Sequence, residues 1–182
     1  MLKRVIQGVA LVLVAPAALL TGFGRIRFLY TVFAHMYAQA PGLPGDYVRI
    51  AFYRLTLEEC SLESRISFGS FFVYPETRVG AGVYIGSYCV IGRVSIGPRT
   101  QIASAVQILS GKNQHVRDAE GHISGSDKGV FTTVSIGADC WIGAAAIVMA
   151  DIGDNTTIGA GSVVTKPIPG NSTAVGNPAR LL

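Results

Sequence analysis

Residues 134–164 read VSIGADCWIGAAAIVMADIGDNTTIGAGSVV, and this stretch decides the fold. An isoleucine followed by glycine recurs in it at Ile136, Ile142, Ile152 and Ile158, and the step from Ile136 to Ile142 and from Ile152 to Ile158 is six residues. A period of six with one bulky inward side chain indicates a short strand followed by a sharp turn. We therefore expect a repeating coil and not an ordinary sheet.

The same pattern extends toward the N-terminus and carries a second element. An aliphatic residue followed by glycine or alanine also occurs at Val79, Ile85, Ile91, Ile96 and Ile102. Four positions after each aliphatic residue of the repeat stands a small or β-branched residue: Val83, Cys89, Ser95, Thr100, Val106, Cys140, Ala146, Thr156 and Ser162. Because side chains alternate along a strand, these residues and the aliphatics should point inward together. Glycine after the aliphatic avoids a Cβ clash at the corner.

Three such strands per coil predict an all-β, triangular parallel solenoid. Two steps are shorter than six residues: that from Ile91 to Ile96 is five, and that from Val148 to Ile152 is four. Both indicate shortened corners.

This repeat resembles that of the hexapeptide-repeat (left-handed β-helix) acyltransferases, over roughly residues 66–180. The resemblance implies a left-handed parallel β-helix, although most crossover connections are right-handed. It also implies acetyl-CoA as acyl donor and a homotrimer, in which cyclic packing covers the flat faces of the solenoid.

The repeat is interrupted by a polar, turn-rich insertion, residues 109–131, which contains His115 and His122. A long loop without its own apolar pattern is usually functional. In the family that the repeat resembles, a loop histidine at this point is the general base, and His115 is the nearer to Ile108. We predict His115 as the catalytic base and His122 as solvent-facing, with a substrate contact as the alternative. Asn113 and Asp118 are predicted to bind the acceptor.

Histidine suits acyl transfer from a thioester. The donor is already activated, so the enzyme needs only to remove the proton of the attacking hydroxyl, and imidazole titrates near neutral pH. Asp118, Glu120 or a loop carbonyl could hold the other ring nitrogen. A backbone N–H at Gly143 or Ala144 could stabilise the charge on the thioester oxygen.

The segments GSVVTKPIPG (161–170) and GNPAR (176–180) look like the closing signature of the same family. The resemblance implies that coenzyme A lies along Trp141, Gly143, Ala144, Ala160, Thr165 and Lys166, with Arg180 near the nucleotide phosphates. Cations at Lys166 and Arg180 suit phosphate. Alternation directs Trp141 outward, where subunit packing and contact with cofactor or acceptor both fit.

No metal is expected. A zinc carbonic anhydrase on the same fold would need three imidazoles, and the solenoid region offers two histidines. The cysteines, Cys60, Cys89 and Cys140, form neither a CxxC pair nor a disulfide framework, so we expect buried thiols in a reducing compartment.

The N-terminal segment is strongly apolar. Residues 5–24 contain no charge and are long enough to span about 30 Å as a helix, with Pro16 favouring a kink. A second apolar stretch, residues 28–40, ends at a breaker, residues 41–45. A cleaved signal peptide, a spanning helix, a monotopic anchor and helices packed on a soluble domain all fit; we favour the anchor. We predict a membrane-associating helical segment and linker at 1–60 and the β-helix domain at 61–182.

Composition and charge support this division. The 182 residues (19.2 kDa) are 49% hydrophobic and 14% charged, which argues against disorder and coiled coil. Residues 1–57 hold six basic residues and one acidic residue, a net charge of +5, whereas the remainder has nine basic and ten acidic residues, a net charge of −1. This placement favours an anionic membrane surface over nucleic acid.

The sequence thus predicts an acetyl-CoA-dependent O-acetyltransferase of a sugar hydroxyl. The expected acceptor is a lipid-linked glycan intermediate of bacterial surface polysaccharide biosynthesis, met at the cytoplasmic side of the inner membrane. The alternatives are a small soluble acceptor (sugar, xenobiotic alcohol or amine) and a non-catalytic trimeric scaffold.

Overall fold

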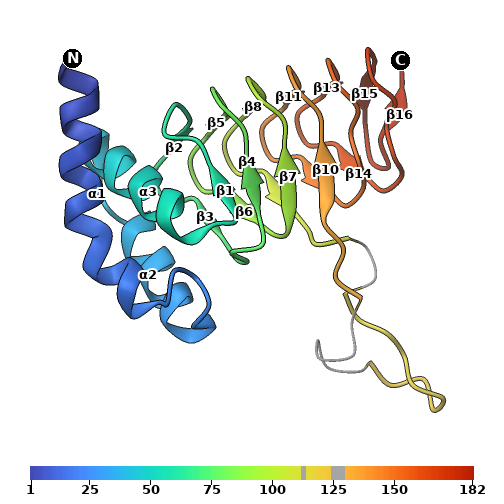
Figure 1. Ribbon diagram of the computed structural model, residues 1–182. Coiled ribbons are helices and arrows are strands. Elements are labelled where there is room, and N and C mark those ends of the chain that lie inside the picture. The colour runs from blue at the N-terminus through green and yellow to red at the C-terminus, as the bar shows by residue number, and fades with distance from the viewer. Residues whose placement is uncertain (112–113, 124–129) are drawn as a thin grey trace.

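A computed structural model describes residues 1–111, 114–123 and 130–182 (Figure 1). The chain begins with three helices, α1 (Leu2–Leu20), α2 (Arg27–Ala38) and α3 (Gly42–Thr56). Short strands follow: β1 (Glu59–Cys60), β2 (Arg65–Ile66), β3 (Phe71–Phe72), β4 (Arg78–Val79), β5 (Tyr84–Ile85), β6 (Val90–Ile91), β7 (Val94–Ile96), β8 (Gln101–Ile102), β9 (Gln107–Ile108), β10 (Val134–Ile136), β11 (Trp141–Ile142), β12 (Ile147–Val148), β13 (Thr157–Ile158), β14 (Val163–Val164), β15 (Thr173–Val175) and β16 (Arg180–Leu181).

The strands form three faces of a parallel solenoid of about six coils. Face A contains β1, β4, β7 and β10; face B runs from β2 through β5, β8, β11 and β13 to β15; face C contains β3, β6, β9, β12 and β14. Isolated parallel bridges from Ile136 to Ile152 and from Ile152 to Ile168 continue face A. β16 alone is antiparallel, paired with β15. The architecture is the predicted one and is consistent with the left-handed coil that the resemblance implies.

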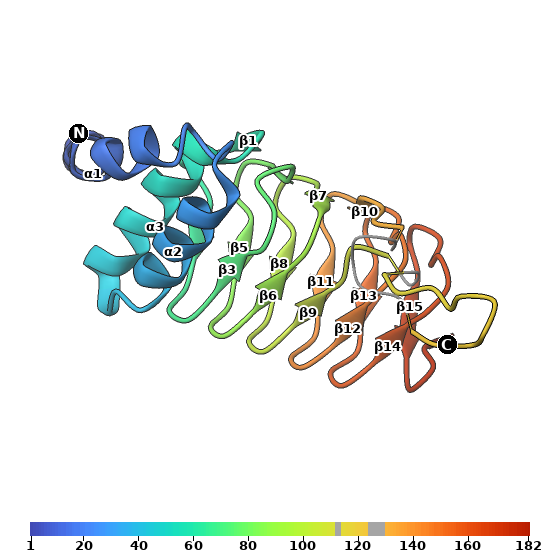
Figure 2. The ribbon, with the colours of Figure 1, turned by 90° about the horizontal axis from the view of Figure 1, so that it is seen from below.

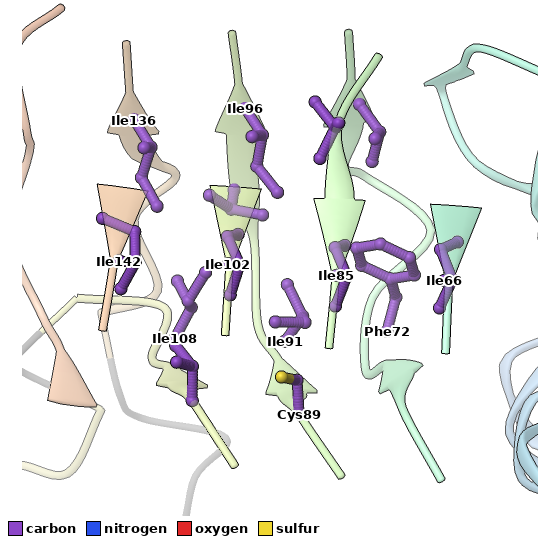
Figure 3. Packing of buried hydrophobic residues seen from close by; sticks show 14 of the residues in the cluster. Ile66, Phe72, Ile85, Cys89, Ile91, Ile96, Ile102, Ile108, Ile136 and Ile142 are labelled. Atoms are coloured by element: carbon purple, nitrogen blue, oxygen red, sulfur yellow. The ribbon is translucent and has the colours of Figure 1, made fainter. Parts of the chain in front are cut away.

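The interior is a set of stacked aliphatic side chains. Figure 3 shows Ile66, Ile85, Ile102 and Ile142 of face B, each directed into the coil beside residues of the other two faces. These isoleucines pair in register from coil to coil, and each is at most 1% exposed. All nine aliphatic residues of the predicted repeat are buried.

The second inward position is confirmed at eight of the nine predicted residues and is wrong at Ser95. Ser95 is half-buried and occupies an outward-facing position of face A. There it pairs with Arg78 of the preceding coil and with Ser135 of the following coil. The five-residue step shortens the preceding corner by one residue. Val94, 1% exposed, therefore takes the inward place.

The glycines after the aliphatics are required by the close approach of neighbouring coils. A Cβ on Gly143 would lie 2.4 Å from the backbone nitrogen of Ala160 in the next coil, a contact that real Cβ atoms do not make. The corner itself is turned three residues after the aliphatic, where Asp139 and Ala145 have φ of 56° and 57°. These glycines are therefore needed for the close packing of neighbouring coils, and not for turning the corner as predicted.

Within the predicted helical segment and linker at 1–60, residues 42–56 form helix α3. The breaker at 41–45 is the start of this helix: Pro41 is its N-cap and Pro44 lies in its first turn, where a missing N–H costs nothing. α3 packs on β1 and β2, α2 packs on β3, and α1 packs mainly on α3 (Figure 2). The helices therefore close the N-terminal end of the solenoid, and α1 is continuous through Pro16.

Arg49 joins this helical end to the coil. Its side chain is fully buried, and it donates to Ile66 O (2.9 Å), to Ala40 O (2.6 Å) and to Asp46 Oδ1 (2.6 Å). Asp46 also accepts from Arg65 Nε at 2.7 Å. One guanidinium thus connects the end of α2, the first turn of α3 and strand β2.

The three cysteines are buried and free, as predicted. Burial raises the pKa of Cys60 to about 12 and also raises the pKa values of Cys89 and Cys140. The thiols therefore stay protonated at neutral pH and act as small apolar side chains.

We predict that Ile102→Ala lowers the free energy of unfolding by about 2–5 kcal/mol, because it leaves a cavity inside a close-packed stack. The matched control is Gln101→Ala, in the same strand with its side chain exposed, which should cost less than about 1 kcal/mol. Denaturant unfolding followed by circular dichroism measures both. Equal losses would contradict the assignment of inward and outward positions.

Candidate active site

The insertion leaves the solenoid at the corner between face C and face A. It begins after β9 and returns at β10, so it separates the third coil from the fourth (Figure 1). The coil continues across it, because β10 pairs with β7 and β12 pairs with β9. The insertion therefore projects from the edge without interrupting the stack.

Both ends of the insertion are held by backbone contacts. The N–H of Thr132 donates to Ser110 O (3.0 Å), and the Ser110 hydroxyl accepts from the N–H of Arg93 (2.9 Å). At the far end, Arg117 and Ile123 form an antiparallel bridge, and the Asp118 N–H donates to His122 O at 3.0 Å. The two ends of the insertion are thus held to the coil, and residues 117–123 form a local hairpin.

A cluster of rings and guanidinium groups fixes the returning end. Phe131 lies 5.8 Å from the ring of Tyr74, and Arg93 stands 5.0 Å above Tyr74 and 5.9 Å above Phe131. The guanidinium carbon of Arg27, the first residue of α2, also lies 5.5 Å from the centroid of the Tyr74 ring. Cation–π contacts of this kind attach the loop to the coil below it.

The loop carries the predicted histidine, His115, which is exposed. Asp118 lies against His122: its Oδ1 accepts from the His122 N–H (2.8 Å), and its Oδ2 is 3.5 Å from Nδ1 of that ring. The predicted solvent exposure of His122 is confirmed, since 79% of its side chain is exposed. The roles of Asp118 in acceptor binding and in orienting His115 stay predictions, and Asn113 lies outside the described residues.

A hollow of about 430 Å³ opens at the root of the loop. It is lined by residues of the insertion's two ends and of the same corner in the next two coils: Gly111, Val130, Thr132, Thr133, Val134, Met149, Ala150, Asp151, Thr165 and Pro167. The structure therefore brings the predicted cofactor residue Thr165 close to the two ends of the insertion. Lys166 follows it and is exposed.

Sequence reasoning missed Met149 and Asp151 in this hollow. Asp151 Oδ1 accepts from the N–H of Ser135 at 2.7 Å, which ties the corner of the fourth coil to β10. Their place in the repeat could have predicted Met149 and Asp151. They lie at the corner that Leu109 occupies one coil earlier and Thr165 one coil later.

The other predicted cofactor residues lie on a different edge, the corner between faces B and C. Ala144 and Ala160 are both exposed there in successive coils, and the Gly161 N–H donates to Ala144 O at 2.8 Å. Val175, next to Gly159, pairs with Arg180 in β16. Ala144, Ala160 and Arg180 therefore follow one edge of the solenoid.

Gly143 is engaged within the coil. Its N–H donates to Ile158 O at 2.7 Å, so it is not available to a thioester oxygen. Of the two backbone N–H groups that were predicted to stabilise the thioester oxygen, only that of Ala144 stays a candidate. Trp141 is 59% exposed on face B, between Gln101 and Thr157, and its predicted outward direction is confirmed.

Face C separates the two edges within one chain. Thr165 follows Ala160 by five residues, which corresponds to about 16 Å of extended chain. The histidine loop and the edge of Ala144 and Arg180 therefore do not converge in a single chain. Among the residues that the structure describes, no group of three or more His, Cys, Asp or Glu side chains could hold a metal ion.

Comparison with known proteins agrees with this geometry. A family model described as the hexapeptide repeat of succinyl-transferase matches residues 133–166. Residues 133–166 therefore carry a hexapeptide repeat. The resemblance seen in the sequence is thereby confirmed, and the coils on both sides of the insertion share the repeat.

Three similar proteins extend the comparison. Nodulation protein L of Rhizobium leguminosarum bv. viciae is 48% identical over 109 residues, which are 57% of this chain and 55% of the relative, so this chain spans about half the length of that protein. A maltose O-acetyltransferase from Clostridium difficile 630 has 27% identity and a TM-score of 0.72, covering 88% of this chain and 86% of that one. AntD, an N-acyltransferase from Bacillus cereus solved with coenzyme A, has 15% identity and a TM-score of 0.51, covering 65% and 68%; it shows the fold alone.

The ring cluster at Phe131 gives a prediction about the loop. Phe131→Ala removes the contacts with Tyr74 and Arg93, which together contribute about 1–2 kcal/mol. We expect tryptic cleavage after the exposed Arg117 to become about tenfold faster. The control is Val130→Ala, the neighbouring exposed residue, which should leave the rate unchanged. Equal rates for wild type and Phe131→Ala would show that the cluster does not hold the loop.

Proposed function

We propose that the protein is an acetyl-CoA-dependent O-acetyltransferase of a sugar hydroxyl. The observation that supports the proposal is an insertion that carries His115 and whose two ends line a hollow with Thr165, in a parallel solenoid with a hexapeptide repeat. Similarity to a maltose O-acetyltransferase over most of both chains supports the reaction and the acceptor class.

In the proposed reaction His115 acts on the acceptor. A ring nitrogen of His115 takes the proton of the attacking hydroxyl as its oxygen bonds to the carbonyl carbon of the acetyl thioester. The N–H of Ala144 would stabilise the charge that develops on the carbonyl oxygen. The C–S bond then breaks, and His115 returns the proton to the leaving sulfur, which gives the acetyl ester and free coenzyme A.

We further propose that the complete site lies between two chains of a homotrimer. Ala144, Ala160 and Arg180 would bind the donor from one chain, while His115, Thr165 and Lys166 belong to the other edge. Because face C keeps the two edges apart in one chain, a second chain is the simplest way to bring them to one ligand. The exposed Trp141, the cationic ends of Lys166 and Arg180, and Gly143 at the same corner complete the proposed donor contacts.

The acceptor that we propose is a lipid-linked glycan intermediate of bacterial surface polysaccharide biosynthesis, at the cytoplasmic side of the inner membrane. The apolar, basic N-terminal helices support membrane association, since one helix, Leu2–Leu20, is long and apolar enough to span by length and composition. A core helix or a signal sequence would pass the same test. A soluble sugar acceptor is the alternative, and transfer to paired soluble and lipid-linked sugars distinguishes the two.

We predict that His115→Ala lowers the rate of hydroxyl-dependent release of coenzyme A at least about a hundredfold, because the general base is lost. A thiol-reactive dye measures the release. His122→Ala is the matched control, since it changes the second histidine of the same loop, and it should keep most of the activity.

Equal rates for wild type and His115→Ala would overturn the assignment of the base. A loss with His122→Ala alone would transfer the role to His122 and its partner Asp118. Absence of hydroxyl-dependent release from the wild type with any sugar would favour the non-catalytic scaffold.

A further inference from the structure

Helix α1 lies at the end of the molecule opposite the C-terminus (Figures 1 and 2), and many large apolar side chains are exposed there. We name this surface the apolar tip and define it by the exposed large hydrophobic residues of α1, of the turn after it and of α2: Leu2, Val5, Val9, Val12, Leu13, Leu19, Leu20, Phe23, Ile26, Phe28, Val32 and Met36. Scattered exposed apolar residues are ordinary, but a patch that covers a whole helix face marks an interaction site.

The spacing of these residues shows that α1 has two different faces. Val5, Val9 and Val12 follow one another at steps of four and three, the spacing of one side of a helix, and Val12 is 73% exposed. The opposite side carries Ala10, Val14, Ala17 and Ala18, all buried. Small residues let α1 pack closely on α3, and the larger apolar residues face outward.

α1 is attached to the body of the protein near both ends. Near its start, Gln7 Nε2 donates to Leu62 O of the first coil at 2.7 Å. Just after its end, Gly24 lies so close to α3 that a Cβ there would be 2.3 Å from Thr56 O. A helix held along its length against a folded domain does not cross a bilayer, although its length would allow it.

An apolar hollow of about 390 Å³ lies beside α1 and enlarges this surface. It is formed between α1 and α3 and lined by Ile6, Val9, Ala10, Leu13, Leu43, Pro44, Tyr47 and Val48. Val9 and Leu13 belong to both the hollow and the apolar tip, so the two are continuous.

Charge indicates which apolar partner fits. Lys3 and Arg4 stand at one end of α1 and Arg25 and Arg27 beyond the other, and the first acidic residue of the chain is Asp46. Arg27 pairs with Glu76, and the exposed Lys3, Arg4 and Arg25 place positive charge at both ends of the apolar stripe. An apolar face between basic ends is complementary to a bilayer with anionic headgroups.

We propose that the apolar tip docks on the surface of an anionic bilayer, with α1 lying in the plane of the interface and the solenoid pointing away from it. The proposal rests on the membrane association in the proposed function and deepens it by naming the surface and its orientation. In a cyclic trimer with parallel solenoids, three such tips would lie at the same end and bind together.

The orientation restricts the acceptor. The hollow at the root of the loop lies at the fourth and fifth coils, and adjacent coils are about 4.8 Å apart, so with the helical layer it stands about 25 Å from α1. A lipid-linked acceptor would therefore present its reacting hydroxyl on a sugar well beyond the headgroup.

Vesicle sedimentation of the full-length protein tests the surface. We expect binding to phosphatidylcholine vesicles containing about 30% phosphatidylglycerol, and weaker binding to phosphatidylcholine alone or at high salt. Val12→Glu should weaken binding at least about tenfold. The control Leu182→Glu places the same charge on an equally exposed apolar residue at the opposite end and should have no effect.

Two further measurements test the orientation. A fluorophore on Val12→Cys should be quenched by lipids carrying nitroxide groups and one on Leu182→Cys should not, while the native thiols are buried and do not react. Alkaline carbonate should release the protein from vesicles. Resistance to release would show that α1 spans the bilayer and would overturn the proposal. Failure of the protein to bind vesicles would also overturn it, whether or not the protein associates with itself through α1.

Failure of this proposal is distinguishable from failure of the proposed function. His115→Ala should bind vesicles like the wild type, because it lies on the distant loop. Val12→Glu should keep the wild-type rate of acetyl transfer to a soluble sugar such as maltose. A wild-type protein that transfers acetyl groups but does not bind vesicles would reject the docking surface and leave the proposed function intact.

Discussion

The structure depends on the stacking of single aliphatic side chains inside a coil with two-residue strands. Each strand contributes one large inward residue, and each coil places it directly above its equivalent in the coil before, as in the series Ile85, Ile102 and Ile142. Because neighbouring coils come so close that Gly143 has no room for a Cβ, a side chain at such a corner would separate them. Residues can therefore be changed freely only at outward positions, at corners that do not contact the next coil, and in insertions.

This constraint explains where chemistry is found. An insertion at a corner leaves the stack intact, since β7 pairs with β10 and β9 with β12 across it. The rigid coil then presents residues of successive turns, such as Met149 and Thr165, at regular spacing close to the two ends of the insertion. Catalytic groups on a loop that is rooted in a rigid scaffold are a common arrangement in enzymes. The faces of the coil, by contrast, supply flat surfaces for association.

The coil could be predicted from the sequence because the repeat consists of aliphatic residues that must point inward and glycines that must lie against the next coil. The prediction failed at Ser95, where a five-residue corner shifts the register and Val94 is the inward residue. It also missed α3, because Pro41–Gly45 resembles a breaker when the tertiary partner of the helix, strand β2, is unknown. The buried Arg49 binds Ala40 O and Ile66 O, which are distant in the sequence. No local sequence pattern could have predicted these contacts. Of the candidate site, the sequence located the loop, Thr165 and the exposed edge of Ala144 and Ala160, but the hollow depends on which corners stack.

The central claim is that a histidine loop of one chain and the donor edge of another form one site. Complementation between two inactive variants tests it most directly, with His115→Ala in one chain and Ala160→Trp, which blocks the exposed edge, in the other. If the site is shared, co-refolded mixtures will regain a substantial part of the wild-type activity, since some sites combine an intact loop with an intact edge. Mixed oligomers that form but stay as inactive as either parent would contradict the account.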